Sequence, residues 1–130
     1  MKSRIHTLVA GAALLLASMP AYVHHSGAMF DSGREETIKG TITEFNWTNP
    51  HSSFKVDVTG PDGKSAVWAI EMNSPQNLIR TGWKRTSIKP GDVVTVVVHP
   101  LRDGKPGGSY VSITLSNGTK LGGSGPGQSE

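Results

Sequence analysis

The chain has 130 residues and no cysteine. This length has room for one domain, and the lack of cysteine excludes disulfide bonds and a lipid-anchored N-terminal cysteine, so the hydrophobic core alone must hold the fold together. The formal net charge is +3, and it falls to +1 if an export signal leaves with Lys2 and Arg4. So small an excess argues against nucleic acid as a partner, because nucleic-acid-binding domains cluster Lys and Arg on one face.

Residues 1–21 have the pattern of a secretory signal peptide, with a basic start, an apolar centre over residues 8–17 and a small-residue end. The apolar centre is about half of the ~20 residues needed to span a bilayer, so we expect cleavage rather than a membrane anchor. The cut is predicted after Ala21, or as late as Val23. The mature protein is therefore expected to be periplasmic or secreted, without a membrane span.

An N-terminal arm is expected over residues 22–35, and two adjacent histidines, His24 and His25, stand near its start. Their chemistry depends on the cut. Cleavage after Ala21 leaves His24 in third position, where the terminal amine, two backbone amides and the imidazole can encircle square-planar Cu(II) or Ni(II). Cleavage after Val23 makes His24 the first residue, whose amine and ring can chelate a metal together. In the alternative interpretation the two histidines belong to a solvated arm.

The first strand pattern after the arm changes face partway along. Ile38, Gly40 and Ile42 share one face, and the apolar face then switches to Phe45 and Trp47. A switch of face together with a strand glycine predicts a bulged, strongly bent strand.

A tight turn fixes how the next two strands pair. Gly60-Pro61-Asp62-Gly63 predicts a three-residue hairpin loop with its last glycine in the left-handed conformation. A slip by one residue would destroy the apolar pairs that follow. These pairs are Val58 with Ala66, Val56 with Trp68 and Phe54 with Ile70. The same register predicts that His51, Ser53 and Glu71 lie near one another on the opposite face.

A short helix separates this hairpin from the last strands. Ser74 is a good N-cap, Pro75 suits the first helical position and Gly82 suits the stop. Two more strand patterns follow at residues 93–98 and 111–115.

Three strands, a helix and two strands follow one another in the order of the OB-fold. We therefore expect a mostly β protein, a small five-stranded Greek-key barrel over residues 36–121, with its one short helix between strands three and four. An Asn117-Gly118 turn is expected to allow one further short hairpin. Residues 122–130 are rich in Gly and Ser and predict a flexible tail.

Six short motifs follow one another along the mature chain. They are His24-His25-Ser26, Trp47-Thr48-Asn49-Pro50-His51, Trp68-Ala69-Ile70-Glu71, Ser74-Pro75-Gln76-Asn77-Leu78, Gly82-Trp83 and Lys89-Pro90-Gly91-Asp92. In these motifs the sequence resembles a family of small exported bacterial proteins catalogued as a domain of unknown function. The resemblance covers the whole mature domain and implies an exported, OB-like domain without implying an activity. In that family a small-residue cleavage site leads straight into His-His-Ser, whereas Tyr22 and Val23 intervene here.

The histidines make a transition metal the first candidate ligand. His24, His25 and His51, together with the terminal amine, are the predicted metal ligands, and copper is the first choice before nickel and zinc. Glu71 and Met72 are weaker candidates beside His51. In the alternative interpretation His51 caps a loop, and Glu71 forms only a structural hydrogen bond to that loop or to a neighbouring serine.

In an OB-fold, the loop between strands one and two and the loop between strands four and five border the ligand face. Asn49 and Pro50 lie in the first loop and Trp47 stands beside it, and all three are predicted to contribute to such a face, with Trp47 as a platform for a base or a sugar. His99 opens the second loop. It is a weaker metal candidate that could meet His51 there, or it simply ends its strand.

The sequence carries no recognisable catalytic pattern. The chain lacks a cysteine nucleophile, a Gly-x-Ser-x-Gly elbow, a phosphate-binding loop and a His-Glu-x-x-His helix. We therefore expect an exported, non-enzymatic binding protein whose leading ligand is copper or another transition metal. The alternatives are an interaction module that docks a protein partner in the cell envelope without a metal, and a small-ligand or sugar-binding barrel that uses Trp47.

Overall fold

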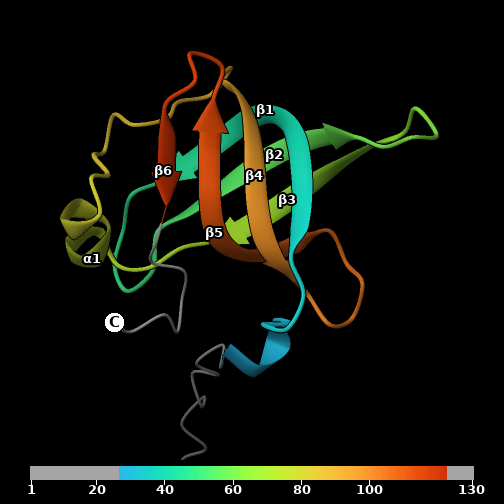
Figure 1. The fold of residues 1–130 in the computed structure, drawn as a ribbon, viewed down its shortest axis with the longest axis horizontal. Coiled ribbons are helices and arrows are strands. Elements are labelled where there is room, and N and C mark those ends of the chain that lie inside the picture. The colour runs from blue at the N-terminus through green and yellow to red at the C-terminus, as the bar shows by residue number, and fades with distance from the viewer. Residues whose placement is uncertain (1–26, 123–130) are drawn as a thin grey trace, which may run out of the picture.

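Six strands and one helix make up the fold, which a computed structural model describes over residues 27–122 (Figure 1). A short 3-10 helix, Gly27–Met29, comes first. The strands and the helix that follow are β1 (Glu36–Asn46), β2 (Ser53–Thr59), β3 (Ser65–Glu71), α1 (Pro75–Arg80), β4 (Val93–Pro100), β5 (Gly107–Leu115) and β6 (Lys120–Gly122). Within the described residues, no helix is long and apolar enough to cross a membrane. The predicted signal peptide, most of the predicted tail and the His24-His25 pair lie outside these residues.

The strands close into the barrel that the sequence predicts. The sheet order is β3-β2-β1-β4-β5-β6, and its neighbouring strands are antiparallel. A parallel contact of Ala69–Glu71 in β3 with residues 107–109 of β5 closes the ring. This closed five-stranded barrel, with one short helix between β3 and β4, is an OB-like fold. The Asn117-Gly118 turn adds β6 as a sixth strand beside β5.

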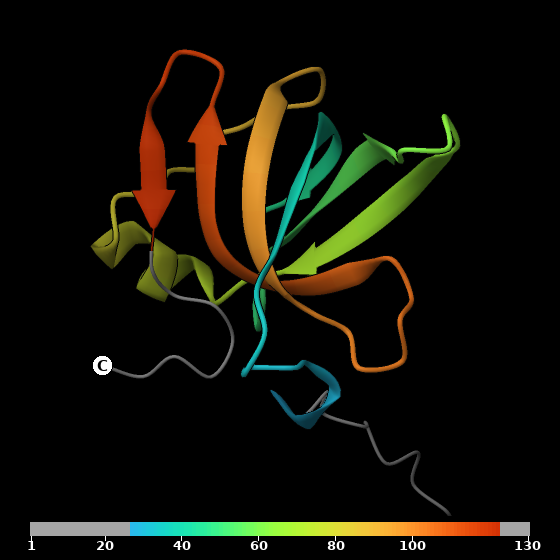
Figure 2. The same cartoon turned by 45° about the vertical axis from the view of Figure 1, so that its right-hand side comes forward.

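The β2–β3 hairpin has the predicted register. Its apolar pairs are Val58 with Ala66, Val56 with Trp68 and Phe54 with Ile70. The Gly60 amide donates to the Lys64 carbonyl across 2.8 Å, and Gly63 has a φ of 77°. Only a residue without a Cβ adopts this left-handed conformation readily, which explains the glycine at the end of the turn. Both ribbon views show the tip of this hairpin projecting away from the barrel (Figures 1 and 2).

Two glycine positions let strands approach closely. The pairing of β1 with β2 shifts between Ile42 and Glu44, which is the predicted bulge. A Cβ on Gly40 would collide with the carbonyl oxygen of Asp57 in β2. A Cβ on Gly108 would lie 2.6 Å from the carbonyl oxygen of His99.

The strand β5 begins at Gly107, four residues before the apolar pattern at 111–115 that predicted it. The strand starts with two glycines, and because glycine is depleted in strands the sequence pattern did not indicate this start.

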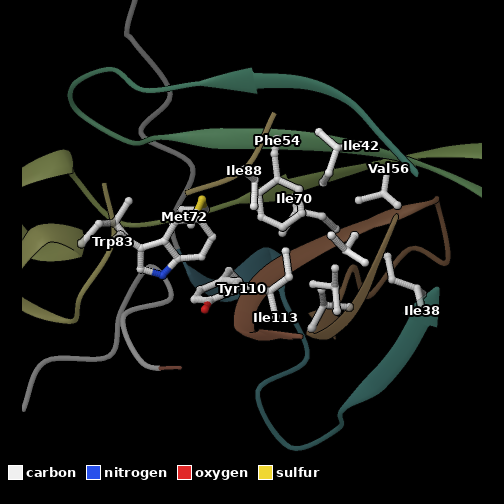
Figure 3. Close-up of a cluster of buried hydrophobic side chains, with 14 residues drawn as sticks. Ile38, Ile42, Phe54, Val56, Ile70, Met72, Trp83, Ile88, Tyr110 and Ile113 are labelled. Atoms are coloured by element: carbon white, nitrogen blue, oxygen red, sulfur yellow. The ribbon is translucent and has the colours of Figure 1, made fainter. Parts of the chain in front are cut away.

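The core fills the barrel and extends to the helix end (Figure 3). Ser74 caps α1, since its side-chain oxygen accepts from the Asn77 amide, and Gly82 follows with a φ of 91°. Trp83 is buried and packs edge-on against Tyr110 with ring centroids 5.4 Å apart. Full burial of large apolar side chains stabilises a fold by about 1.5–3 kcal/mol each. By its burial against Tyr110, Trp83 closes the end of the barrel next to α1.

Candidate functional site

A groove lies along β2 and β3, and the β4–β5 loop together with the N-terminal arm forms one of its walls. Its volume is about 370 Å³. The groove is lined by Met29, Phe30, His51, Ser53, Phe54, Lys55, Ala69, Ile70, Glu71, Leu101 and Gly108. The β1–β2 and β4–β5 loops both contribute to it, which is the position of the ligand face in OB-folds.

The arm is fixed to the β4–β5 loop. Phe30 is 5% exposed and forms an isolated β-bridge with Leu101. The Arg102 amide donates to the Met29 carbonyl, and the Arg102 guanidinium Nε donates to the Ala28 carbonyl, each across 3.0 Å. These bonds hold the start of the described chain at one wall of the groove.

Among residues 27–122, only one ring nitrogen of His51 has a hydrogen-bond partner. Its Nδ1 lies 3.0 Å from the carbonyl oxygen of Met72, and its side chain is 44% exposed. A carbonyl oxygen can only accept a hydrogen bond, so in the neutral ring Nδ1 carries the proton and Nε2 keeps its lone pair. The loop is held nearby by the Ser52 amide, which donates to the Asn73 carbonyl across 3.0 Å.

Glu71 stands beside this histidine, as the hairpin register predicts. It pairs with Ser53 across the hairpin, and its Oε1 lies 4.0 Å from His51 Nδ1. Its side chain is 24% exposed. A histidine that binds a metal through one nitrogen usually donates its other N–H to a carbonyl or a carboxylate, which fixes the ring and raises its basicity. The carbonyl of Met72 and the carboxylate of Glu71 offer that support on the Nδ1 side.

The charge of Lys55 in the groove is already paired. Lys55 Nζ donates to Glu44 Oε2 across 2.9 Å. Hydrogen bonds from Lys55 and then from Asn46 lower the pKa of Glu44 below its ordinary value. Because Lys55 is engaged with Glu44, Glu71 and His51 are the ionisable side chains of the groove that it leaves available to a ligand.

The remaining predicted ligands lie apart from His51. Met72 is fully buried, and its thioether packs in the core (Figure 3). His99 does not line the groove, and its Nδ1 lies 2.9 Å from the Arg34 carbonyl. Between residues 27 and 122, no three His, Asp or Glu side chains converge on one point. His24 and His25 lie outside the described residues.

The predicted ligand face of Trp47, Asn49 and Pro50 does not line the groove. Trp47 lines a separate hollow of about 410 Å³ instead. The hollow is lined by Trp47, Ile79, Gly82, Trp83, Lys84 and Arg85. The β1–β2 loop therefore carries two sites, with Trp47 at one and His51 at the other.

Sequence reasoning missed the arm as a wall of the groove. Met29 and Phe30 are the only pair of adjacent large apolar residues between residues 24 and 37. Such a pair in a polar segment predicts docking onto the core, and Phe30 does become buried. The sequence could not predict that Leu101 lines the groove, because this depends on where the β4–β5 loop lies.

Comparisons with known proteins add a family and a distant structural likeness. The model of a family of unknown function, DUF6152, matches residues 12–110. No curated protein matches the chain significantly. The crystal structure of a mitochondrial single-stranded DNA-binding protein from S. cerevisiae, Rim1, is similar with a TM-score of 0.38 and 20% sequence identity. The likeness covers 70% of this chain and 81% of that chain.

Proposed function

The chain belongs to the family of unknown function DUF6152, and from its own residues we propose that it is an exported, non-enzymatic binding protein. The proposed ligand is a transition-metal ion, bound at the rim of the groove. Copper is the first choice. The observation that carries the proposal is the state of the half-exposed His51: its Nδ1 is tied to the Met72 carbonyl across 3.0 Å, and its Nε2 has no hydrogen-bond partner among residues 27–122.

The N-terminal histidines supply the other ligands in this proposal. His25 stands four residues before Met29, which lines the groove with His51. A fully extended chain covers at most ~3.6 Å per residue, so four residues span at most about 14 Å. In this proposal the arm is short enough to bring its histidines to the groove that Met29 and His51 both line. The hydrogen bonds from Arg102 to the Met29 and Ala28 carbonyls fix the arm at the groove, which lowers the entropy that the arm would lose on binding a metal together with His51.

The donor set favours copper over other divalent ions. Imidazole nitrogens suit copper, nickel and zinc, and a terminal amine adds a further nitrogen. For the same nitrogen ligands Cu(II) binds most tightly in the first-row series. Glu71 acts here from the Nδ1 side of His51, where its negative charge favours a bound cation.

Titration of the mature protein with Cu(II) tests this proposal. The protein is exported from its natural precursor, its N-terminus is sequenced, and nitrogen couplings are read by electron paramagnetic resonance. His51→Gln is expected to lower the Cu(II) affinity by about tenfold or more and to remove one nitrogen coupling. The double variant His24→Ala, His25→Ala is expected to lower it further.

His99→Gln is the matched control, because His99 also has Nδ1 next to a carbonyl, at 2.9 Å, but does not line the groove. It is expected to bind Cu(II) like the wild type. Unchanged affinity in His51→Gln would contradict a site at the groove, and unchanged affinity in the double variant would contradict a site on the arm.

The apolar lining of the groove favours a second candidate function, an envelope interaction module that docks a partner protein without a metal. Met29, Phe30, Ala69 and Leu101 form much of its wall. In this case the mature protein stays metal-free on titration. A photo-crosslinking residue at Leu101 would then capture an envelope protein, and excess free wild-type protein would suppress the crosslink.

A further inference from the structure

A run of sequence around α1 is basic and contains no acid. Between Met72 and Gly91 there are four cationic residues and neither Asp nor Glu. Lys89 is paired with Asp92, its Nζ lying 2.7 Å from Asp92 Oδ1. The other three, Arg80, Lys84 and Arg85, are exposed, and none of the ion pairs within residues 27–122 involves them. We call these three residues the basic patch.

Apolar side chains lie beside the basic patch. Leu78 in α1 is fully buried, whereas Ile79 points outward and is 60% exposed. Ile79 shares the hollow of about 410 Å³ with Trp47, Lys84 and Arg85. An exposed isoleucine next to a half-buried indole, both surrounded by cations, is an apolar surface that water solvates poorly.

The indole of Trp47 is held in place from the core outward. Tyr110 packs against Trp83, Trp83 against Phe45 at 6.2 Å between centroids, and Phe45 edge-on against Trp47 at 5.9 Å. This series of rings fixes the hollow on a rigid base. The hollow and the groove have no lining residue in common, so they can be occupied independently.

We propose that the hollow and the basic patch dock the protein on an anionic phospholipid surface. Cations attract the lipid phosphates, while Ile79 and Trp47 enter the boundary between head groups and acyl chains, where aliphatic side chains and indoles are favoured. Single-stranded nucleic acid fits less well, because bases stack on exposed aromatic faces. Of the two aromatic rings that line the hollow, Trp83 is buried and Trp47 is half-buried. This proposal does not rest on metal binding.

Flotation with lipid vesicles tests the proposal on the mature full-length protein. The probes are phosphatidylcholine vesicles and equimolar phosphatidylcholine–phosphatidylglycerol vesicles. We expect binding to the anionic vesicles only, weakened by added salt. The triple variant Arg80→Gln, Lys84→Gln, Arg85→Gln is expected to lower the partition coefficient by about tenfold or more, since each cation near an anionic surface contributes substantially.

The matched control removes the same charge elsewhere. Lys39, Lys64 and Lys105 are exposed and lie outside the hollow, and their triple change to Gln is expected to keep most of the vesicle binding. An equal loss in both triple variants would overturn the proposal, because binding would then follow net charge alone. Circular dichroism confirms that each variant is folded before its binding is scored.

The apolar contact has its own readout. Lipids brominated along the acyl chain quench an indole that enters the bilayer, and we expect them to quench wild-type fluorescence but to lose most of that quenching in Trp47→Phe. Ile79→Ser is expected to weaken vesicle binding while the protein stays folded, because Ile79 is exposed. Binding of an oligo-dT strand that is lost in the basic-patch variant, without any vesicle binding, would overturn the proposal in favour of nucleic acid.

Discussion

The hydroxyl of Tyr110 donates a 2.7 Å hydrogen bond to the carbonyl oxygen of Leu121. Tyr110 lies in β5 and is fully buried, whereas Leu121 belongs to the short outer strand β6. One side chain thus ties the last strand of the described chain to the aromatic core.

Replacing Tyr110 with Phe is expected to lower the free energy of unfolding by about 1 kcal/mol, because one buried hydrogen bond is lost while the ring remains. Urea unfolding measures this change. Hydrogen exchange at the β6 amides is expected to accelerate more than exchange at β1. If the β6 amides exchanged equally slowly in the wild type and in Tyr110→Phe, the hydrogen bond would not hold β6 in place.

The same side chain predicts a loss of stability at alkaline pH. Burial raises the pKa of Tyr110 above its ordinary value of 10.0. The unfolded chain ionises this tyrosine above about pH 10, whereas the folded chain keeps it neutral, so the stabilisation is complete below pH 10 and falls as the pH rises further. The free energy of unfolding is therefore expected to fall more steeply above pH 10 in the wild type than in Tyr110→Phe. Identical slopes would show that Tyr110 does not contribute.

Gly40 is predicted to tolerate no side chain. A Cβ there would collide with the Asp57 carbonyl oxygen and lie 2.8 Å from Val56 Cγ1. Gly40→Ala is expected to lower the free energy of unfolding by about 1–3 kcal/mol, measured by urea or thermal unfolding. Gly33→Ala is the control, since the nearest atom to its Cβ would be Asp31 Oδ1 at 3.6 Å, and it should change stability by no more than ~0.5 kcal/mol. Similar losses in both variants would contradict the close approach of β1 and β2.

Glu71 is predicted to support the metal through His51 rather than to determine the fold. Glu71→Gln keeps the size of the side chain but removes the negative charge 4.0 Å from His51 Nδ1. If the proposed site is correct, the Cu(II) affinity falls by about tenfold, as for other residues that support a metal-binding histidine. Glu35→Gln removes the same charge at an exposed position outside the groove and should leave the affinity unchanged. If Glu71→Gln and Glu35→Gln lowered the Cu(II) affinity equally, the effect would come from net charge alone and the prediction would be wrong.

Local chemistry explains why so much of the fold could be predicted. The Gly60-Pro61-Asp62-Gly63 turn and the apolar pairs leave one register for the β2–β3 hairpin, and that register brings Glu71 near His51. Ser74, Pro75 and Gly82 likewise bound the helix through capping rules that depend on neighbouring residues alone.

Contacts between distant segments were harder to foresee. The parallel pairing of β3 with β5 and the docking of Phe30 on Leu101 join residues far apart in the chain, and neither leaves a periodic signal. The orientation of Trp47 was likewise hidden, because Phe45 and the buried Trp83 draw it to the hollow on the helix side. The positions of Trp47 and His51 in the sequence therefore did not reveal that they line different depressions.

The way the arm is held also governs how the protein should be purified. An affinity tag ahead of Gly27 would begin two residues before Met29, which lines the groove, and a polyhistidine tag there would compete with His51 for the proposed metal. A tag after β6 would begin near the hollow, since a Cβ on Gly82 would lie 3.9 Å from Leu121. The tip of the β2–β3 hairpin projects from the barrel (Figures 1 and 2), and its residues Pro61, Asp62 and Gly63 line neither the groove nor the hollow. An internal tag at this tip is therefore expected to leave both intact.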